Sequence, residues 1–383
     1  MKHNFRVIIG MLALFIPLCI NAQNDVQQQV NELKGKVDRM PKISGFVQGM
    51  YIGNLDEGGK LTDNTFRMRR VRLSVEGNLA KGLTYKIQGD FTRKPMLVDA
   101  FVKYKACDAF AIQIGQFKTP FTIESPINPV NLEIFDYGES VQKLVGYSDV
   151  CGVGSLGRDL GIMASGSLFP IKGEEGIKYH VMEYALGVFN GNGANELDNN
   201  NRKDIVGRLY VHPGLKDLTL SGSYYYGLYR NTTVEDQIAA SGIAVGKTVF
   251  PNGVRNRWAA GIQYNDGKLV IRGEYISGQT SCKIGGLDEH ANPAIFEDIL
   301  NSKGYYAVAG YNFAIGKDKS PKLMPVLRYE HFAKSPLMGT EWYTVGINYW
   351  PLKSLNFKFD YSLIMTGSDI DGHRIVALLS YKF

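Results

Sequence analysis

The sequence has little net charge, few histidines and few cysteines for its length. Its 383 residues hold 43 Lys and Arg and 37 Asp and Glu, and the resulting charge of +6 is too small by itself to indicate nucleic-acid binding. The four cysteines form no CxxC pair, so neither a zinc site nor a disulfide framework is expected. The six histidines are scattered, which argues against a metal site built from neighbouring histidines.

Enzyme motifs are also missing. The sequence contains no GxSxG, no HExxH and no GxxxxGK[ST]. The serines of SGSYYYG and YGES have no base at a helical or hairpin spacing, so strand and loop positions are predicted for them. The run DNNN at 198–201 offers oxygen ligands for calcium, but it is more typical of a solvated turn. We therefore expect neither a cofactor nor a resident metal.

No apolar run reaches the ~18–20 residues of a membrane-spanning helix. The apolar segment at 7–20 follows Lys2 and Arg6 and precedes small residues around Ala22, a layout that predicts a signal peptide over residues 1–22. Cleavage there removes one cysteine and leaves Cys107, Cys151 and Cys282, so at most one disulfide can form.

Residues 23–40 carry a short heptad pattern. Their apolar positions are spaced 4, 3, 4 and 3 residues apart: Val26, Val30, Leu33, Val37 and Met40. This spacing predicts a short helical segment, although two heptads are too few for a stable isolated helix. Two interpretations are open, a frayed linker helix and a small coiled coil that joins subunits.

From Ile43 onward the apolar residues alternate with polar ones. LTYKIQGDF at 83–91 and LNFKFDYSL at 355–363 are examples, and each such segment has the ~10 residues that a tilted strand needs to cross a bilayer. We count about 16 segments, an even number as in bacterial outer-membrane barrels. The sequence thus predicts an all-β fold, a 16-stranded antiparallel transmembrane β-barrel over residues 41–383.

The connections between the segments differ in length on the two sides. Short turns are predicted at PGLKD, NDGK and PLKS. The longer connections would face outward, and they cover residues 53–64, 118–158, 190–202, 230–253 and 280–302. Long outer loops with short inner turns are typical of outer-membrane barrels. The connection 118–158 is the longest, and we expect it to fold inward and narrow the lumen.

The stretch FRMRRVRLSVEG at 66–77 indicates which face is which. Val71, Leu73 and Val75 share one face of the predicted strand, and a charge on the lipid face costs ~2–4 kcal/mol near the midplane. Arg70 and Arg72 should therefore point into the lumen. Arg67 and Arg69 fall in the opposite phase, which predicts contact with headgroups or a place in the adjoining loop.

The same phase argument places further charged residues on the lumen side. They are Lys86, Asp90, Asp99, Lys103, Arg208, Arg257, Arg272, Glu274, Arg328, Glu330, Lys358, Asp360, Arg374 and Lys382. One interpretation is a cross-strand salt-bridge lattice, built for example from Arg272, Glu274, Arg328 and Glu330. The other is a wall that favours anions, because its basic residues outnumber its carboxylates.

Several segments resemble the phosphate-selective porin family, the porin O and porin P group. They are RMRRVRLSVEGNLAKGLTYKIQGDF, VDAFVKY, IQIGQFKTPF, GRDLGIMASG, YALGVFNGNG and SGSYYYG. The resemblance implies a 16-stranded barrel, a homotrimer and passive passage of anions. It also implies that Arg70 and Arg72 belong to an arginine ladder, that Lys118 of GQFK holds anions, and that Asp99 tunes the constriction.

This chain differs from the family in one segment. Where the family often carries a basic F-M-E-R-like segment after GQFK, this chain reads NLEIFDYGESVQKLVGY, with Glu133, Asp136 and Glu139 and one cation, Lys143. A general preference for anions, or a solute other than phosphate, therefore stays open.

These observations predict a porin of a Gram-negative outer membrane that passes small hydrophilic solutes and prefers anions such as phosphate. The final strand ends in Phe383, which resembles the sorting signal read by the barrel assembly machinery. Outer-membrane lipid is the other expected partner, and nucleic acid is not. The alternatives are an outer-membrane hydrolase and an adhesion barrel that binds through its loops. The predicted pore-lining and anion-binding residues are Arg70, Arg72, Lys86, Asp99, Lys118, Arg208, Arg257, Arg272 and Arg328.

Overall fold

The computed structural model describes residues 40–229, 253–287, 293–316, 321–335 and 338–383. The predicted signal peptide and, apart from Met40, the predicted helical segment lie outside these residues and stay predictions. Within them, no helix has the length and apolar character needed to cross a membrane.

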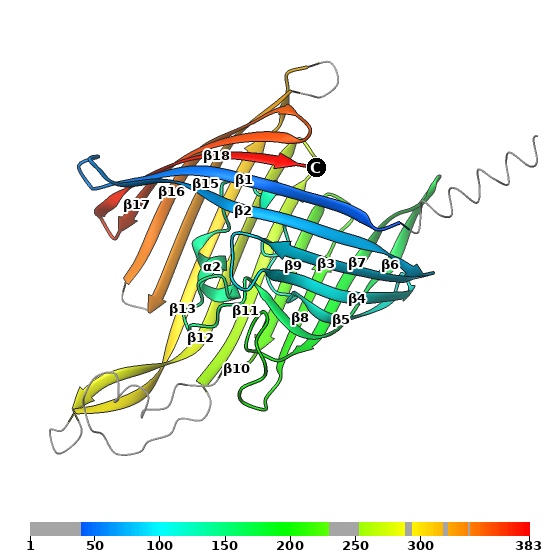
Figure 1. The fold of residues 1–383 in the computed structure, drawn as a ribbon, viewed down its shortest axis with the longest axis horizontal. Helices are drawn as coiled ribbons and strands as arrows, with labels where there is room; N and C mark the ends of the chain where they lie inside the picture. The colour runs from blue at the N-terminus through cyan, green and yellow to red at the C-terminus, as the bar shows by residue number, and fades with distance from the viewer. Residues whose placement is uncertain (1–39, 230–252, 288–292, 317–320, 336–337) are drawn as a thin grey trace, which may run out of the picture.

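The chain forms one antiparallel sheet that closes on itself, because β1 pairs with both β2 and β18 (Figure 1). β10 (Leu228–Tyr229) and β14 (Phe313–Ala314) are two-residue pieces that follow β9 and β13, so 16 of the 18 strands build the wall. This confirms the predicted 16-stranded barrel. The sixteen are β1 (Lys42–Leu55), β2 (Leu61–Ala80), β3 (Leu83–Asp90), β4 (Leu97–Cys107), β5 (Phe110–Lys118), β6 (Arg158–Gly173), β7 (Gly176–Phe189), β8 (Asp204–Val211), β9 (Leu218–Tyr226), β11 (Gly253–Asn265), β12 (Leu269–Leu287), β13 (Pro293–Tyr311), β15 (Lys322–Ser335), β16 (Met338–Leu352), β17 (Leu355–Thr366) and β18 (Asp369–Lys382).

The alternation along the strands separates the lipid face from the lumen. On β17, Phe357 and Phe359 are exposed, whereas Asn356, Lys358 and Asp360 are buried inside the barrel. Aromatic rings also form a row across five strands of the outer surface, with neighbouring centroids 5.1–6.4 Å apart. The row consists of Trp258, Tyr275, Tyr305, Tyr329 and Tyr343. Such a girdle is expected where an apolar band of ~25 Å meets the headgroups.

One predicted outer loop is wrong. Residues 280–302 are mostly strand, because the pairing of β12 with β13 continues from Thr280 opposite Leu300 to Leu287 opposite Pro293. β11 pairs with β12 only as far as Thr280, and β15 pairs with β13 only as far as Lys303. The hairpin therefore extends beyond the barrel wall as a two-stranded ribbon (Figure 1). Alternation does not reveal these strands, because apolar residues stand next to each other here, for example Ile295 with Phe296 and Ile299 with Leu300.

A β-bulge corrects the predicted phase of two arginines. Gln48 of β1 faces Arg70, but the next residue, Gly49, faces Met68, so Arg69 is an extra residue without a partner. Beyond the bulge, Arg67 lies opposite the buried Met50 and therefore shares the lumen face. The prediction that Arg67 and Arg69 leave the lumen is thus wrong, and the bulge turns all four arginines of this strand inward.

The longest predicted loop folds into the lumen, as expected. Residues 119–157, here called the lumen loop, contain a 3-10 turn, η1 (Pro129–Asn131), and one short helix, α2 (Glu139–Val145), which Figure 1 shows inside the barrel. α2 ends at Gly146, whose φ of 100° belongs to the left-handed region. Apolar side chains of the loop, among them Leu132 and Leu144, pack with wall residues in a buried core. One side of the lumen is therefore filled like the interior of a soluble domain.

Candidate functional site

The arginines of the far wall hold the lumen loop. Arg272 of β12 donates to both carboxylate oxygens of Glu133, at 3.2 and 2.5 Å, and it also contacts Glu124 at 3.4 Å. Arg328 of β15 pairs with Glu124 and with Glu330. Glu124 is fully buried, so one loop carboxylate joins two wall strands. We call these pairs, together with those of Asp136 and Asp149 below, the loop clamp.

A second part of the clamp is formed on β11. Arg257 donates to Asp149 at 2.6 and 2.7 Å and to the Leu144 carbonyl, and Arg255 contacts Asp149 at 3.3 Å. Burial alone would raise the pKa of Asp149, but the two guanidinium charges outweigh it and hold that pKa below its ordinary value. Burial and the nearby Asp149 raise the pKa of the Cys151 thiol to about 11, so this thiol is protonated at neutral pH.

The third part lies on β2. Arg70 donates to Asp136 at 2.7 Å, and Arg69 contacts the other oxygen of the same carboxylate. Arg70 is 1% exposed, so the predicted ladder arginine is in the lumen but is covered by the loop. Arg72 pairs instead with Asp90 of β3 at 2.9 Å.

Lys118 and Asp99 support the base of the lumen loop. The Lys118 ammonium donates to the carbonyls of Ser125 and Ile127 and to the Tyr137 hydroxyl at 2.9 Å. Asp99 accepts two bonds from Arg158, at 2.7 and 3.2 Å. These contacts hold the two ends of the loop in place, and they leave the Lys118 ammonium already saturated with oxygen acceptors.

The remaining predicted residues lie apart from this group. Lys86 is partly exposed and 3.7 Å from Glu76, and Arg208 stacks over the Tyr210 ring at 4.2 Å. The structure therefore places all nine predicted residues on the lumen side. It brings most of them into contacts with the loop or with wall carboxylates rather than into an open ladder. The predicted lattice of Arg272, Glu274, Arg328 and Glu330 is present only in part, since Glu274 accepts from the backbone of Ile123 in the loop.

Sequence reasoning missed a cluster at the outer end of β2. A cavity of about 320 Å³ is lined there by the exposed Met68 and by four polar residues, Arg67, Arg69, Thr92 and Arg93, which we call the outer-mouth cluster. The side chain of Arg93 is 30% exposed and lies 3.8 Å from Asp90. Arg67 has no ion pair among the described residues. No sequence signal locates the bulge that turns Arg67 inward, although Arg93 is visible in the turn after β3.

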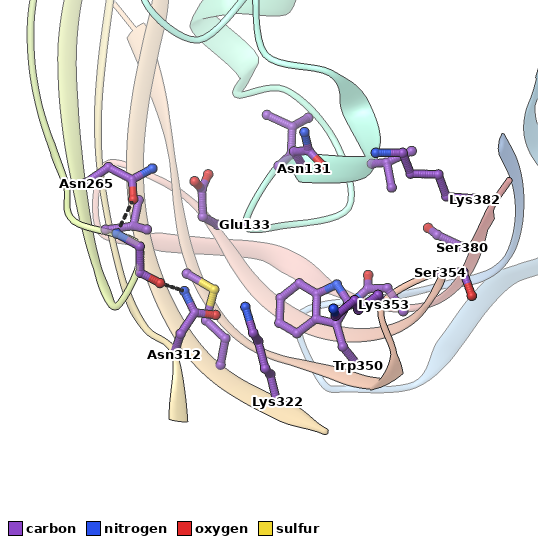
Figure 2. Close-up of a pocket in the computed structure, with 16 residues that line it drawn as sticks. Asn131, Glu133, Asn265, Asn312, Lys322, Trp350, Lys353, Ser354, Ser380 and Lys382 are labelled. Atoms are coloured by element: carbon purple, nitrogen blue, oxygen red, sulfur yellow. Dashed lines mark hydrogen bonds between the residues drawn. The ribbon is translucent and has the colours of Figure 1, made fainter. Parts of the chain in front are cut away.

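A larger pocket of about 530 Å³ lies on the other side of the lumen loop, at the end of the barrel predicted to face the periplasm (Figure 2). Asn131 and Glu133 enter it from the loop, and Trp350 and Lys322 enter it from the wall (Figure 2). Figure 2 also shows Lys353 and Lys382 at its rim. Both ends of the lumen are therefore lined by cations.

The structure describes no cluster of three or more His, Cys, Asp or Glu side chains that could hold a metal ion within the residues it covers. Asp198 of the DNNN run binds Lys203 and two backbone amides. Cys107 and Cys151 are free thiols, and the side chain of Cys282 lies outside the described part.

Known proteins resemble this chain in sequence pattern and in fold. A family model described as phosphate-selective porin O and P matches residues 43–374. The anion-selective porin from Comamonas acidovorans superposes with a TM-score of 0.59 at 12% identity, over 90% of this chain and 99% of that chain. OmpF of Salmonella typhi, in complex with daunomycin, gives 0.58 at 12% identity over 90% and 98%. The outer membrane channel DcaP of Acinetobacter baumannii gives 0.57 at 12% identity over 90% and 97%. None of the curated proteins matches significantly.

Proposed function

This chain belongs to the family of phosphate-selective porins O and P, and from that premise we propose that anions enter it through the outer-mouth cluster. As a porin of the Gram-negative outer membrane it lets small hydrophilic solutes diffuse passively, with a preference for anions. The finer proposal concerns which residues supply that preference, since the clamp has already neutralised most of the predicted arginines.

The observation that carries the proposal is the charge balance at the outer end of β2. Arg70 and Arg72 stand next to the outer-mouth cluster, and among the described residues the carboxylates paired with these five arginines are Asp90 and Asp136. Together the five arginines and two carboxylates leave an excess of three positive charges, and the exposed guanidinium groups of the cluster can bind an oxyanion with their fork of donors. Rings of Arg and Lys select for anions in this way.

An anion then moves along the wall of β2 to β4. Charged side chains that keep contact with solvent lie on this route, first Arg93 and then, nearer the inner end, Lys86 and Lys103. Contacts of this kind are individually weak, so an anion that enters the site can also leave it. No covalent step is needed. Phosphate fits this chemistry, and family membership supports it as a substrate.

The proposal makes the protein a channel rather than an enzyme or an adhesin, and the charged lumen supports that choice. We also propose a homotrimer, contact with outer-membrane lipid through the aromatic row, and assembly through the strand that ends in Phe383. We propose no nucleic-acid partner.

Reversal potentials in planar bilayers under a KCl gradient test the anion route. We expect the wild type to be anion-selective and to be blocked by added phosphate. Arg67→Gln combined with Arg93→Gln should lower the anion-to-cation permeability ratio by up to about thirtyfold, since each of the two unit charges at ~4 Å in water is worth ~1 kcal/mol. Lys81→Gln, in an exposed inner turn, is the matched control. An unchanged ratio in the double variant would refute this entry site.

A further inference from the structure

The pocket on the inner side of the lumen loop contains a buried amide with no partner. Asn356 of β17 is 2% exposed, and neither its amide nitrogen nor its amide oxygen makes a hydrogen bond to any residue that the structure describes. Buried polar groups are nearly always satisfied, because an unmade hydrogen bond leaves the desolvation cost uncompensated. Asn356 lines the pocket, so a ligand there can supply both the donor and the acceptor that it lacks.

Three ammonium groups surround the same pocket. Lys322 stands at the start of β15, Lys353 in the turn between β16 and β17, and Lys382 at the end of β18 (Figure 2). None of them has an ion pair or hydrogen bond within the part of the chain that the structure describes. The carboxylate that lines the pocket, Glu133, is held by Arg272 at 2.5 Å. The pocket therefore favours an anion.

The pocket also offers a flat apolar surface beside these charges. Trp350 is partly buried and packs against the lumen core, and it lies directly opposite Lys322 in the pairing of β15 with β16. Asn356 lies opposite Ser380 in the same way. A sugar ring presents an apolar C–H face to an aromatic ring and hydroxyl groups to amides, so an indole next to amides matches its shape and polarity.

We propose that this pocket binds a sugar monophosphate on its way through the channel. The phosphate group lies among the three lysines, the sugar ring stacks on Trp350, and a hydroxyl group pairs with the amide of Asn356. Inorganic phosphate uses only the lysines and leaves Trp350 and Asn356 without a role. The inference rests on the proposed function, since it names a solute class for the same channel.

Isothermal titration of the purified full-length barrel in detergent tests the pocket with three probes: glucose 6-phosphate, inorganic phosphate and glucose. We expect glucose 6-phosphate to bind about tenfold or more tightly than either of the others, since each extra ~1.4 kcal/mol of contact is one factor of ten. Equal affinity for glucose 6-phosphate and inorganic phosphate would overturn the proposal, and so would binding of neither.

Two variants separate recognition from folding. Asn356→Leu keeps the number and branching of side-chain heavy atoms and removes an unsatisfied polar group, so the barrel should fold as before and bind glucose 6-phosphate about tenfold more weakly. Trp350→Leu should weaken it to a similar degree. Trp258→Leu, on the lipid face, is the matched control and should change nothing. Wild-type affinity in both pocket variants would overturn the inference.

The two proposals fail in different ways. Asn356→Leu keeps every charged side chain, so its anion selectivity in bilayers should equal that of the wild type. If the wild type is anion-selective but binds glucose 6-phosphate no better than phosphate, the pocket inference is wrong and the entry site stands. If glucose 6-phosphate binds as expected and its affinity falls in the pocket variants while the channel is unselective, the entry site is wrong and the sugar-phosphate site stands.

Discussion

The arginines on the far wall and those at the outer mouth carry the same charge but differ in their surroundings. Arg257, Arg272 and Arg328 are nearly fully buried and paired with carboxylates of the lumen loop. Arg67 and Arg93 keep contact with solvent and have few or no carboxylates nearby. The first group acts on the loop, and the second is free to act on a solute. An inward-facing arginine is therefore not by itself an anion site.

The largest expected effect comes from removing a clamp carboxylate. Glu124→Gln leaves the buried Arg272 and Arg328 without their shared partner, which should lower the free energy of unfolding by ~3–5 kcal/mol. Urea unfolding in lipid vesicles measures it. Glu175→Gln, in an exposed inner turn, serves as the control. Equal midpoints for both variants would show that the clamp contributes nothing to stability.

A second variant turns paired arginines into free ones. Asp136→Asn removes the carboxylate that Arg69 and Arg70 share, so the outer mouth gains one net positive charge. The anion-to-cation permeability ratio should rise by up to about fivefold, as for one unit charge at ~4 Å in water. Reversal potentials measure the ratio, and a fall instead of a rise would contradict the proposed route.

Salt should weaken the electrostatic effect of the exposed outer-mouth arginines more than that of the buried far-wall arginines. Raising KCl from ~0.1 to ~1 M shortens the Debye length from ~10 to ~3 Å, which screens exposed charges far more than buried pairs. We expect the permeability ratio to fall by about twofold to threefold, while the urea midpoint of the barrel stays nearly constant. A midpoint that follows the permeability ratio would mean that the clamp is open to solvent.

The smallest effect is expected from mild acid. Burial alone would raise the pKa of Glu124, but Arg328 and Arg272 hold it below its ordinary value, and Asp149 behaves likewise. A carboxylate with a lowered pKa stabilises the fold above the ordinary carboxyl pKa of ~4, and this contribution is lost as pH falls through the lowered value. The difference in urea midpoint between the wild type and Glu124→Gln should therefore be constant from pH 8 to 5. A transition near pH 6 would require a different titrating group.

Much of the fold was predictable from local pattern. Alternation fixes which residues of a strand face lipid, so the lumen positions of Arg70, Arg257 and Arg328 follow from sequence. The bulge at Arg69 was not predictable, because one extra residue on β2 is defined only against its partner strand. The role of Glu133 and Asp136 was not predictable either. Their effect on selectivity depends on the wall arginines they contact, and those are far away in sequence.

The lumen loop touches both sides of the seam where the barrel closes. Phe135 packs against Met50 of β1 and against Val376 and Leu378 of β18, and its backbone N–H donates to Asp360 of β17. Pairing β1 with β18 joins residues such as Phe46 and Lys382, so it carries the largest loss of chain entropy in the molecule. Because the loop contacts both edges, its packing offsets part of that loss. The segment that narrows the pore is thus also a bridge across the seam.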